Sequence, residues 1–416
     1  MNAALETLKE RGFFQQCTDV DSLSARMDAG PITFYVGCDP TGPSLHIGHM
    51  VPFFALKHLR AAGNTGIALI GGGTARIGDP SGKTEMRKMI SYEQIDDNVK
   101  HIEKQLDRFI GFDGKTALAD NNKNWLADLN YIDFLRDIGS CFSVNKMLSF
   151  EAYKQRMERE DGLSFIEFNY QLLQSYDFLM LHQRHNCILQ IGGDDQWGNI
   201  TAGVDLIRRK LGGTTELNKQ HECYGLTFPL VKRADGKKMG KTEKGAIFLD
   251  PALTSVFDFF QYWRNVADPD VRKFFLLFTF LPVSEIDKIV SGNINEAKER
   301  LAYEVTAIIH GREEADKALS GAKAAFGGEG DKSHMPTAEV AKSVFDTGIG
   351  IIDLFFEAKL GATKSDIRRL IQQGGASLNG KSVSDVKAVI SLKDADSDGE
   401  FVLQAGKKKF VRVVLK

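Results

Sequence analysis

The chain has 416 residues, of which 43% are hydrophobic and 26% charged, and its formal net charge at pH 7 is −2. This is the composition of an ordinary globular protein that is long enough for two or three domains with buried cores. The N-terminal stretch is charged where a signal peptide needs an apolar run, and the longest apolar stretch, residues 274–283, is too short to span a bilayer. We therefore expect a cytoplasmic protein with no membrane segment.

The five cysteines are odd in number, scattered, and free of any C-x-x-C spacing. This pattern argues against a disulfide framework and against a structural zinc site. We expect no protein-bound metal, and we expect Cys38 to be a small buried thiol because no general base is implied beside it.

Residues 32–49 form the most informative stretch of the chain. A strand pattern over residues 32–36 ends in a turn rich in glycine and proline, after which Ser44 predicts the N-cap of a helix running towards Ala62. His46 and His49 are three apart, so they share one face of the first helical turn. A helix start exposes unpaired N–H groups, and two imidazoles there indicate an anion site, with phosphate as the expected anion. Taken alone, such histidines are more often solvated or structural.

The full run Asp39-Pro-Thr-Gly-Pro-Ser-Leu-His-Ile-Gly-His49 resembles the signature of the class I aminoacyl-tRNA synthetases, with residues 46–49 as its HIGH element. Tyr35, just before the turn, points to the tyrosyl branch of that class. Gly48 has no side chain, so it leaves room for an adenine ring against the helix. The resemblance implies phosphate or nucleotide roles for Thr41, His46 and His49, and ATP binding by Gly37, Asp39 and Gly48.

A second buried strand is predicted over residues 66–71, so that strand, helix and strand make a βαβ unit of a doubly wound nucleotide-binding fold. Ligands of such folds bind at the carboxyl ends of the strands. Residues 82–84, Gly-Lys-Thr, mimic the end of a P-loop, but the leading glycine would have to be residue 77, which is isoleucine. By resemblance, Asp79 holds the amino group of tyrosine, while Lys83 and Arg87 serve phosphate.

Residues 88–165 read as mainly helical and charged, and solvated amphipathic helices are the default interpretation of this segment. In the resembled family, such an insertion splits the nucleotide fold and builds the subunit interface and the acceptor-stem contact. The resemblance therefore implies a homodimer.

Residues 165–179 carry the specificity argument. Tyr170, Gln174 and Asp177 are spaced four and then three apart, so they form one polar stripe on a helix with Phe and Leu neighbours. Such a stripe is costly against an apolar pocket unless a ligand pairs with it. Asp177 with Tyr35 suits a phenolic hydroxyl, whereas Gln174 and Tyr170 suit the ammonium group. Without the upstream signature, a solvent-facing stripe would be favoured.

Two further stretches complete the expected ligand contacts. Residues 188–199 combine a strand, two glycines and acidic residues, and they resemble the tyrosyl synthetase G-x-D-Q-W-G-N motif. Asp194 in this stretch stays unassigned. After a strand predicted over residues 226–231, residues 238–242 resemble the class I KMSKS loop, although lysines on a glycine-flanked loop would otherwise indicate a solvated turn. The ligand roles implied by these resemblances fall to Gln190, Gly193, Asp195 and Gln196, and to Lys238, Met239 and Lys241.

The remaining chain predicts a helical segment over residues 251–326, a flexible linker, and a basic C-terminal region. Thr363 and Asp366 predict a capping box, and Asn379-Gly380 a hairpin turn. Residues 361–416 hold eleven Lys/Arg against six Asp/Glu, which suits phosphate contacts. This region resembles an S4 RNA-binding domain, and the expected RNA-binding side chains are Lys364, Arg368 and Arg369.

The predicted fold class is α/β: a Rossmann-like, doubly wound parallel sheet with a helical insertion, followed by a helical domain and a small α+β S4-like domain. The expected boundaries are 1–225 for the catalytic domain, with the insertion at about 88–185, then 226–326, a linker over 327–348, and 349–416.

The resemblance to bacterial-type tyrosyl-tRNA synthetases covers nearly the whole chain. It implies that tyrosine reacts with ATP, with Mg2+ accompanying ATP and no tightly bound cofactor, and that tyrosine then passes to tRNA(Tyr). Two alternatives stay open from the sequence: a tryptophanyl-tRNA synthetase, and a non-catalytic RNA-binding protein on a synthetase body.

Overall fold

The computed structural model describes residues 1–81, 90–158, 162–212, 221–236, 239–242, 245–325, 331–406 and 409–416. The chain divides into two compact units. The first contains residues 1–253 and 272–283, and the second contains residues 254–271 and 284–416. Arg11 shows why residues 272–283 belong to the first unit: its buried guanidinium donates to the carbonyls of Leu276 (3.1 Å) and Thr279 (2.9 Å).

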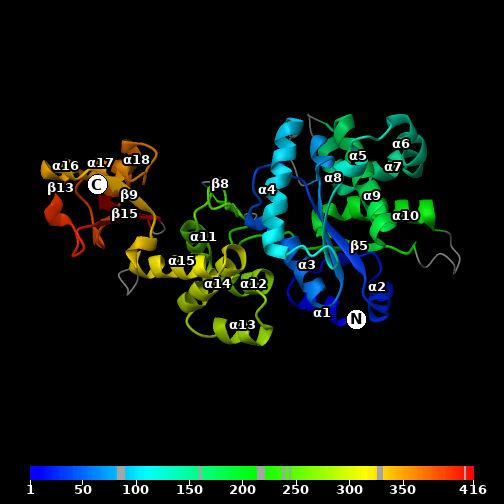
Figure 1. Ribbon diagram of the computed structural model, residues 1–416, viewed down its shortest axis with the longest axis horizontal. Coiled ribbons are helices and arrows are strands. Elements are labelled where there is room, and N and C mark those ends of the chain that lie inside the picture. The colour runs from blue at the N-terminus through cyan, green and yellow to red at the C-terminus, as the bar shows by residue number, and fades with distance from the viewer. Residues whose placement is uncertain are drawn as a thin grey trace. The chain divides into compact units, whose positions relative to one another are not determined.

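A six-stranded sheet forms the centre of the first unit (Figure 1). Five of its strands are parallel, and a short edge strand pairs antiparallel with the strand beside it. The strands, in spatial order, are β1 (Gln16–Cys17), β6 (Tyr224–Phe228), β5 (Cys187–Gly193), β2 (Thr33–Cys38), β3 (Thr65–Ile70) and β4 (Ala117–Asn121). The inner strands are apolar because helices cover both faces of the sheet, as is typical of parallel sheets.

The helices of the first unit pack on both faces of this sheet. Figure 1 shows α3 and α4 on one side of the strands and α9 and α10 on the other. This confirms the predicted doubly wound arrangement. The longer helices are α1 (Ala3–Glu10), α2 (Val20–Asp28), α3 (Val51–Ala61), α4 (Tyr92–Ile110), α9 (Phe165–His185), α10 (Trp197–Leu211) and α12 (Val271–Phe278).

The helix predicted to begin behind Ser44 begins later than expected. A 3-10 turn, η1 (Ile47–Met50), precedes α3, and the N-cap of this turn is His46, whose imidazole accepts a hydrogen bond from the Gly48 N–H over 3.1 Å. The Ser44 hydroxyl instead donates to the Leu45 carbonyl (2.8 Å). The prediction of Ser44 as N-cap was wrong because the histidine side chain satisfies the free backbone donor at this helix start.

The segment predicted as mainly helical, residues 88–165, contains a strand that the sequence did not indicate. Strand β4 pairs in parallel with β3 at the edge of the sheet, and only Ala117 of its residues is fully buried. An edge strand needs no continuous apolar run, so its sequence lacks the pattern of the inner strands. The helices around it are α5 (Lys123–Leu126), α6 (Tyr131–Asp137), α7 (Val144–Leu148) and α8 (Glu151–Met157).

The second unit begins with helices and ends with a sheet. The helices α11 (Val256–Arg264), α14 (Ile294–His310) and α15 (Arg312–Ala325) pack together. In the chain, α13 (Val283–Val290) lies between α11 and α14. The sheet has five strands in the order β12 (Lys381–Ser382), β11 (Ala376–Leu378), β14 (Phe401–Ala405), β15 (Lys409–Leu415) and β9 (Thr337–Val340). Three short helices accompany the sheet: α16 (Lys342–Asp346), α17 (Ile351–Glu357) and α18 (Lys364–Gln372).

The hairpin turn predicted in this region is confirmed, because Asn379-Gly380, both with positive φ, turns β11 into β12. The predicted capping box is confirmed in part: Thr363 caps α18 by accepting from the Asp366 N–H, but the Asp366 carboxylate accepts from the Thr363 hydroxyl rather than from the Thr363 N–H. Residues 337–340, however, were expected to be linker and form β9, which pairs in parallel with β15. A short, partly exposed edge strand again gave no strong pattern. No helix in the described ranges is long and apolar enough to cross a membrane.

Candidate active site

A cavity of about 610 Å3 opens at the carboxyl ends of β2, β3, β5 and β6 in the first unit. This is the edge of the sheet where the sequence predicted a ligand. Sixteen of the side chains or glycines expected to contact ligands line it: Tyr35, Gly37, Asp39, Thr41, His46, Gly48, His49, Asp79, Tyr170, Gln174, Asp177, Gln190, Gly193, Asp195, Gln196 and Met239.

The cationic members of the expected site are not placed by the structure. Lys83, Arg87 and Lys238 lie outside the described residues, and Lys241 is described only through its backbone in β7 (Lys241–Thr242). Their proximity to the cavity stays a prediction.

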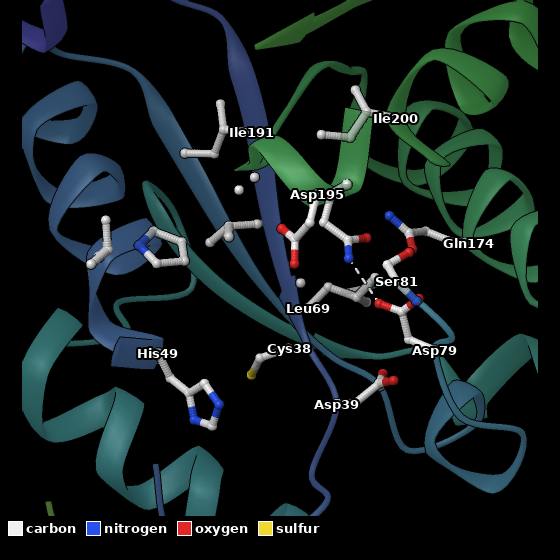
Figure 2. A pocket seen from close by; sticks show the side chains of 18 of the residues that line it. Cys38, Asp39, His49, Leu69, Asp79, Ser81, Gln174, Ile191, Asp195 and Ile200 are labelled. Atoms are coloured by element: carbon white, nitrogen blue, oxygen red, sulfur yellow. Dashed lines mark hydrogen bonds between the residues drawn. The ribbon is translucent and has the colours of Figure 1, made fainter. Parts of the chain in front are cut away.

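The two histidines lie together at the cavity. The His46 and His49 rings stack with their centroids 3.5 Å apart and their planes at 21°. Figure 2 shows His49 at one end of the cavity, with Asp79 and Gln174 at the other end. The sequence expectation that the two imidazoles lie together is confirmed. The expectation of unpaired N–H groups beside them is wrong, because the N–H groups of Ile47, Gly48 and His49 already donate to the Ile247 carbonyl, the His46 imidazole and the His46 carbonyl.

Gly48 is needed for a close approach within the chain itself. A Cβ at this position would lie 2.9 Å from the carbonyl oxygen of Met239. Residues 245–249 also pair with the signature turn, because the Ile47 N–H donates to the Ile247 carbonyl (3.1 Å) and the Leu249 N–H to the Leu45 carbonyl (2.9 Å). The signature turn and the backbone next to the KMSKS-like lysines are therefore in direct contact.

A buried acid and a buried phenol line one part of the cavity. Asp177 is 2% exposed and Tyr35 1%, and the Tyr35 hydroxyl has no hydrogen-bond partner among the described residues. Asp177 accepts from Asn122 Nδ2 (2.9 Å) and from Trp125 Nε1 (2.7 Å). Burial raises the pKa of Asp177 to about 8, although the two hydrogen bonds lower it. A ligand hydroxyl placed here would meet polar groups that are costly to leave unpaired.

The polar residues around Asp79 are joined by hydrogen bonds. Gln196 Nε2 donates to Asp79 Oδ2 over 2.8 Å, the contact drawn as a dashed line in Figure 2. Asn199 Nδ2 donates to Gln174 Oε1 and to Gln196 Oε1, each over 3.1 Å. This arrangement presents carboxylate and amide oxygens, which suit an ammonium group.

Tyr170 makes a contact that the sequence did not predict. Its hydroxyl donates to Asp39 Oδ2 over 3.0 Å, so it supports the signature turn. Burial, together with the charge of Asp39, raises the pKa of Tyr170 well above its usual value, so the group stays a neutral donor.

Cys38 lies in the cavity wall between His49 and Asp79 (Figure 2). Its side chain is half-buried rather than buried as expected. Desolvation in the cavity wall, and the adjacent charge of Asp39, raise the pKa of this thiol to about 12. A thiol with such a pKa stays protonated at neutral pH, which agrees with the expectation that Cys38 is not a nucleophile.

Several supporting residues were missed from the sequence. Asn122 and Trp125, which hold Asp177, follow the unpredicted strand β4. Asn98 and Gln105 lie on α4, a helix expected to be merely solvated. Asn98 Nδ2 donates to the Pro40 carbonyl and Gln105 Oε1 accepts from the Leu45 N–H, each over 2.9 Å. The only sequence signal for these contacts was the asparagine at position 98, which lies on the apolar face of an amphipathic helix and is buried in the structure.

Asp194, left unassigned from the sequence, also has a clear environment. Its Oδ1 accepts from Gln16 Nε2 on β1 (2.7 Å) and from Thr227 Oγ1 on β6 (2.9 Å). Asp194 thereby fixes the turn η4 (Asp194–Gln196), which carries Asp195 and Gln196 into the cavity.

A doubly wound sheet with a HIGH-type turn, and a cavity that runs from stacked imidazoles to a buried carboxylate, define a class I aminoacyl-tRNA synthetase. Residues 27–327 match the family model described as tRNA synthetases class I (W and Y), and residues 329–413 match the tyrosine–tRNA ligase SYY-like C-terminal domain. The chain is 66% identical to the tyrosine–tRNA ligase of Treponema denticola, with all of both chains covered. It is 60% identical to that of Treponema pallidum, covering 100% of this chain and 99% of the relative.

Among solved structures, a C-terminally truncated mitochondrial tyrosyl-tRNA synthetase of Aspergillus nidulans aligns with a TM-score of 0.70 and 32% identity, covering 78% of this chain and 95% of that one. The chain therefore belongs to the tyrosine–tRNA ligase family. The family model spans both tryptophan and tyrosine enzymes, but these full-length relatives are all tyrosine–tRNA ligases, which removes support for the tryptophanyl alternative.

Proposed function

We propose that this chain activates tyrosine with ATP to form tyrosyl-adenylate and pyrophosphate, and then transfers tyrosine to the 3′-terminal adenosine of tRNA(Tyr). One observation carries the proposal. A single cavity contains both the stacked pair His46 and His49, suited to phosphate, and the buried pair Tyr35 and Asp177, suited to a phenolic hydroxyl. Family membership supports the same reaction.

In the first step, a carboxylate oxygen of tyrosine bonds to the α-phosphorus of ATP. The bond between the α-phosphorus and the oxygen that bridges it to the β-phosphorus breaks, and pyrophosphate leaves. The tyrosine carboxylate is itself the nucleophile, so no protein nucleophile or general base is required. Catalysis then comes from positioning and from charge stabilisation on the leaving group. We assign Thr41 and His46 to the γ-phosphate, His49 to the nucleotide, and Lys83, Arg87, Lys238 and Lys241 to the transition-state charge.

We propose that ATP binds as its magnesium complex, with the ion held mainly by the phosphates, as is usual for Mg2+. Gly37, Asp39, Gly48, Gly193, Asp195 and Met239 are proposed as the nucleotide contacts; all line the cavity. Tyrosine is proposed to contact Tyr35 and Asp177 through its hydroxyl, and Asp79, Tyr170, Gln174, Gln190 and Gln196 elsewhere.

The C-terminal domain is proposed to bind tRNA. Of the three expected cations on α18, Lys364 pairs with Asp353 (2.6 Å) and Arg369 pairs with Asp366. Arg368 is exposed and has no ion pair among the described residues. Arg368 is therefore the side chain most available to phosphate, since the other two must exchange one partner for another.

We also propose a homodimer, supported by apolar side chains that the first unit leaves exposed. Ile132 is 69% exposed, Val144 55% and Phe165 70%. All three lie on α6, α7 and the start of α9, within the insertion where the resembled family places its subunit interface. Exposed apolar side chains of this kind mark association surfaces when they gather in one region. Because tRNA charging serves translation, the cytoplasm is the proposed location.

The domain division expected from the sequence is retained as a proposal: a catalytic domain over 1–225, the loop and helical domain over 226–326, and an S4-like domain over 349–416. Strand β6 crosses the first of these boundaries, and β9 lies inside the expected linker.

The test is amino-acid-dependent exchange of pyrophosphate into ATP, run with each amino acid in turn and followed by charging of tRNA(Tyr). The proposal expects exchange with tyrosine above all others. Exchange with tryptophan alone would support a tryptophanyl enzyme. Binding of tRNA without exchange for any amino acid would support the non-catalytic RNA-binding alternative and overturn the proposal.

A further inference from the structure

A continuous chain of side-chain hydrogen bonds runs along the cavity wall from the phenol end to the signature turn. Asn122 Nδ2 donates to Asp177 Oδ2 (2.9 Å) and to Thr74 Oγ1 (2.9 Å), and Thr74 Oγ1 donates to Asp39 Oδ1 (2.7 Å). Tyr170 then donates to the other oxygen of Asp39. We call Asp177, Asn122, Thr74 and Asp39 the Thr74 relay.

The hydroxyl of Thr74 connects the two halves of this relay, Asn122 on one side and Asp39 on the other. A threonine hydroxyl has one hydrogen to donate, and here it goes to Asp39, so the contact with Asn122 must be one that the oxygen accepts. Thr74 is 2% exposed and Asn122 1%. Hydrogen bonds are stronger in such a buried setting, and bonds in a chain polarise one another.

Gly71, the first glycine of the run before Thr74, is explained by the relay. A Cβ at Gly71 would lie 2.0 Å from Asp39 Oδ1 and 2.5 Å from Thr74 Oγ1, so any side chain there would push the two groups apart. The Gly73 N–H also donates to Asn122 Oδ1 over 2.7 Å, which fixes the amide so that its nitrogen faces Asp177 and Thr74. The relay therefore requires a glycine at position 71 and is supported by the backbone of residue 73.

The relay also connects two carboxylates with different tasks. Asp177 lies at the end of the cavity suited to a phenol, and Asp39 lies in the turn that leads to His46. The charge of Asp39 acts on Asp177 and contributes to its raised pKa, although burial is the larger cause. The two groups therefore influence each other through the protein interior.

We propose that Thr74 is a positioning residue that couples the phenol-binding carboxylate Asp177 to Asp39 in the signature turn, so that a seated tyrosine hydroxyl helps to order the ATP end. This inference rests on the proposed tyrosine-activating function. It requires that removing the hydroxyl weakens both the choice of tyrosine over phenylalanine and the use of ATP in the presence of tyrosine.

The test compares Thr74→Val, which keeps the shape but removes the hydroxyl, with Thr74→Ser, which keeps the hydroxyl. The matched control is Thr306→Val, because Thr306 is fully buried in the helical part of the second unit and its hydroxyl has no partner among the described residues. Pyrophosphate exchange with the unmodified protein first establishes the activity. The variants are then measured with tyrosine and with phenylalanine, together with KM for ATP and thermal stability.

We expect Thr74→Val to lower the ratio of kcat/KM for tyrosine over phenylalanine by about tenfold, the size of a lost hydrogen bond to a charged group. KM for ATP should rise when tyrosine is the substrate. It should change less with phenylalanine, because phenylalanine has no hydroxyl to bind at Asp177. Thr74→Ser should recover most of both effects, and Thr306→Val should show neither.

A loss of stability in Thr74→Val with an unchanged tyrosine-to-phenylalanine ratio and unchanged KM values would overturn the proposal and leave Thr74 a structural residue. Should Thr74→Val not fold, Gly71→Ala breaks the same contact from the other side. Gly72→Ala is its control, because the atoms nearest to its added Cβ all belong to Asn121 and none to the relay. Equal behaviour of these two glycine variants would also overturn the relay. Absence of exchange in the unmodified protein would instead be a failure of the proposed function.

Discussion

Trp125 and Asp177 are joined by a hydrogen bond in which the indole N–H donates to the carboxylate over 2.7 Å. Both side chains are buried, and Arg184 lies over the indole ring with its guanidinium carbon 4.9 Å from the ring centroid. The carboxylate that is proposed to select the substrate is therefore held by an indole that is not part of the cavity lining.

Trp125→Phe removes this donor while keeping an aromatic ring in place. We expect the preference for tyrosine over phenylalanine to fall by about tenfold, because Asp177 loses one of the two bonds that orient it. The measurement is kcat/KM for both amino acids by pyrophosphate exchange. Trp263→Phe, at a fully buried tryptophan of the helical segment, is the control and should leave the preference unchanged.

The raised pKa of Asp177, about 8, predicts how stability depends on pH. An unfolded aspartate has a pKa of about 3.9. The folded pKa is higher, so the carboxyl group contributes stability that is fully present below pH ~4 and is lost as the pH rises through ~8. We expect the melting temperature of the substrate-free protein, relative to that of Asp177→Asn, to fall as the pH rises from about 4 to about 8 and to level off at higher pH. Parallel curves for the two proteins over this range would contradict the raised pKa.

Asp194 is predicted to position the turn that carries Asp195 and Gln196. Asp194→Ala should raise KM for ATP and tyrosine severalfold and lower stability by about 1–3 kcal/mol, because the Gln16 and Thr227 donors lose their acceptor. Asp194→Asn keeps one acceptor oxygen and should be milder. A double-mutant cycle of Asp194→Ala with Thr227→Val checks the contact directly, and full additivity of the two changes would refute it.

His46→Ala is expected to slow adenylate formation by about 100-fold while tyrosine binding changes by less than about threefold, since His46 is assigned to ATP phosphate and not to tyrosine. Single-turnover adenylate formation and equilibrium dialysis of tyrosine give the two quantities. Comparable losses in rate and in tyrosine affinity would count against this assignment.

Phe165→Glu should shift the protein towards a monomer, because it places a charge in the proposed apolar contact. Sedimentation equilibrium measures the change. Val389→Glu alters a side chain that is 63% exposed on β13 (Val389–Ile390) of the C-terminal domain and serves as the control. If the unmodified protein sediments as a monomer at micromolar concentration, the dimer proposal fails.

The sequence by itself determined the elements whose patterns are local. The inner strands are apolar because both their faces are covered, the stripe of Tyr170, Gln174 and Asp177 follows helical spacing, and the cap at Thr363 and the turn at Asn379-Gly380 depend on a few adjacent residues. The resemblance of the motifs then indicated the family, which the comparisons confirm.

Only the tertiary structure decided which side chains hold the site together. Strand β4 is an edge strand with one fully buried residue, so its sequence carries no strong pattern, yet it delivers Asn122 and Trp125 to Asp177. Thr74 and Asp194 act through partners 33 to 178 positions away in the chain. Hydrogen bonds between such distant residues exist only once the sheet has brought its carboxyl ends to one edge, and no spacing along the chain encodes them.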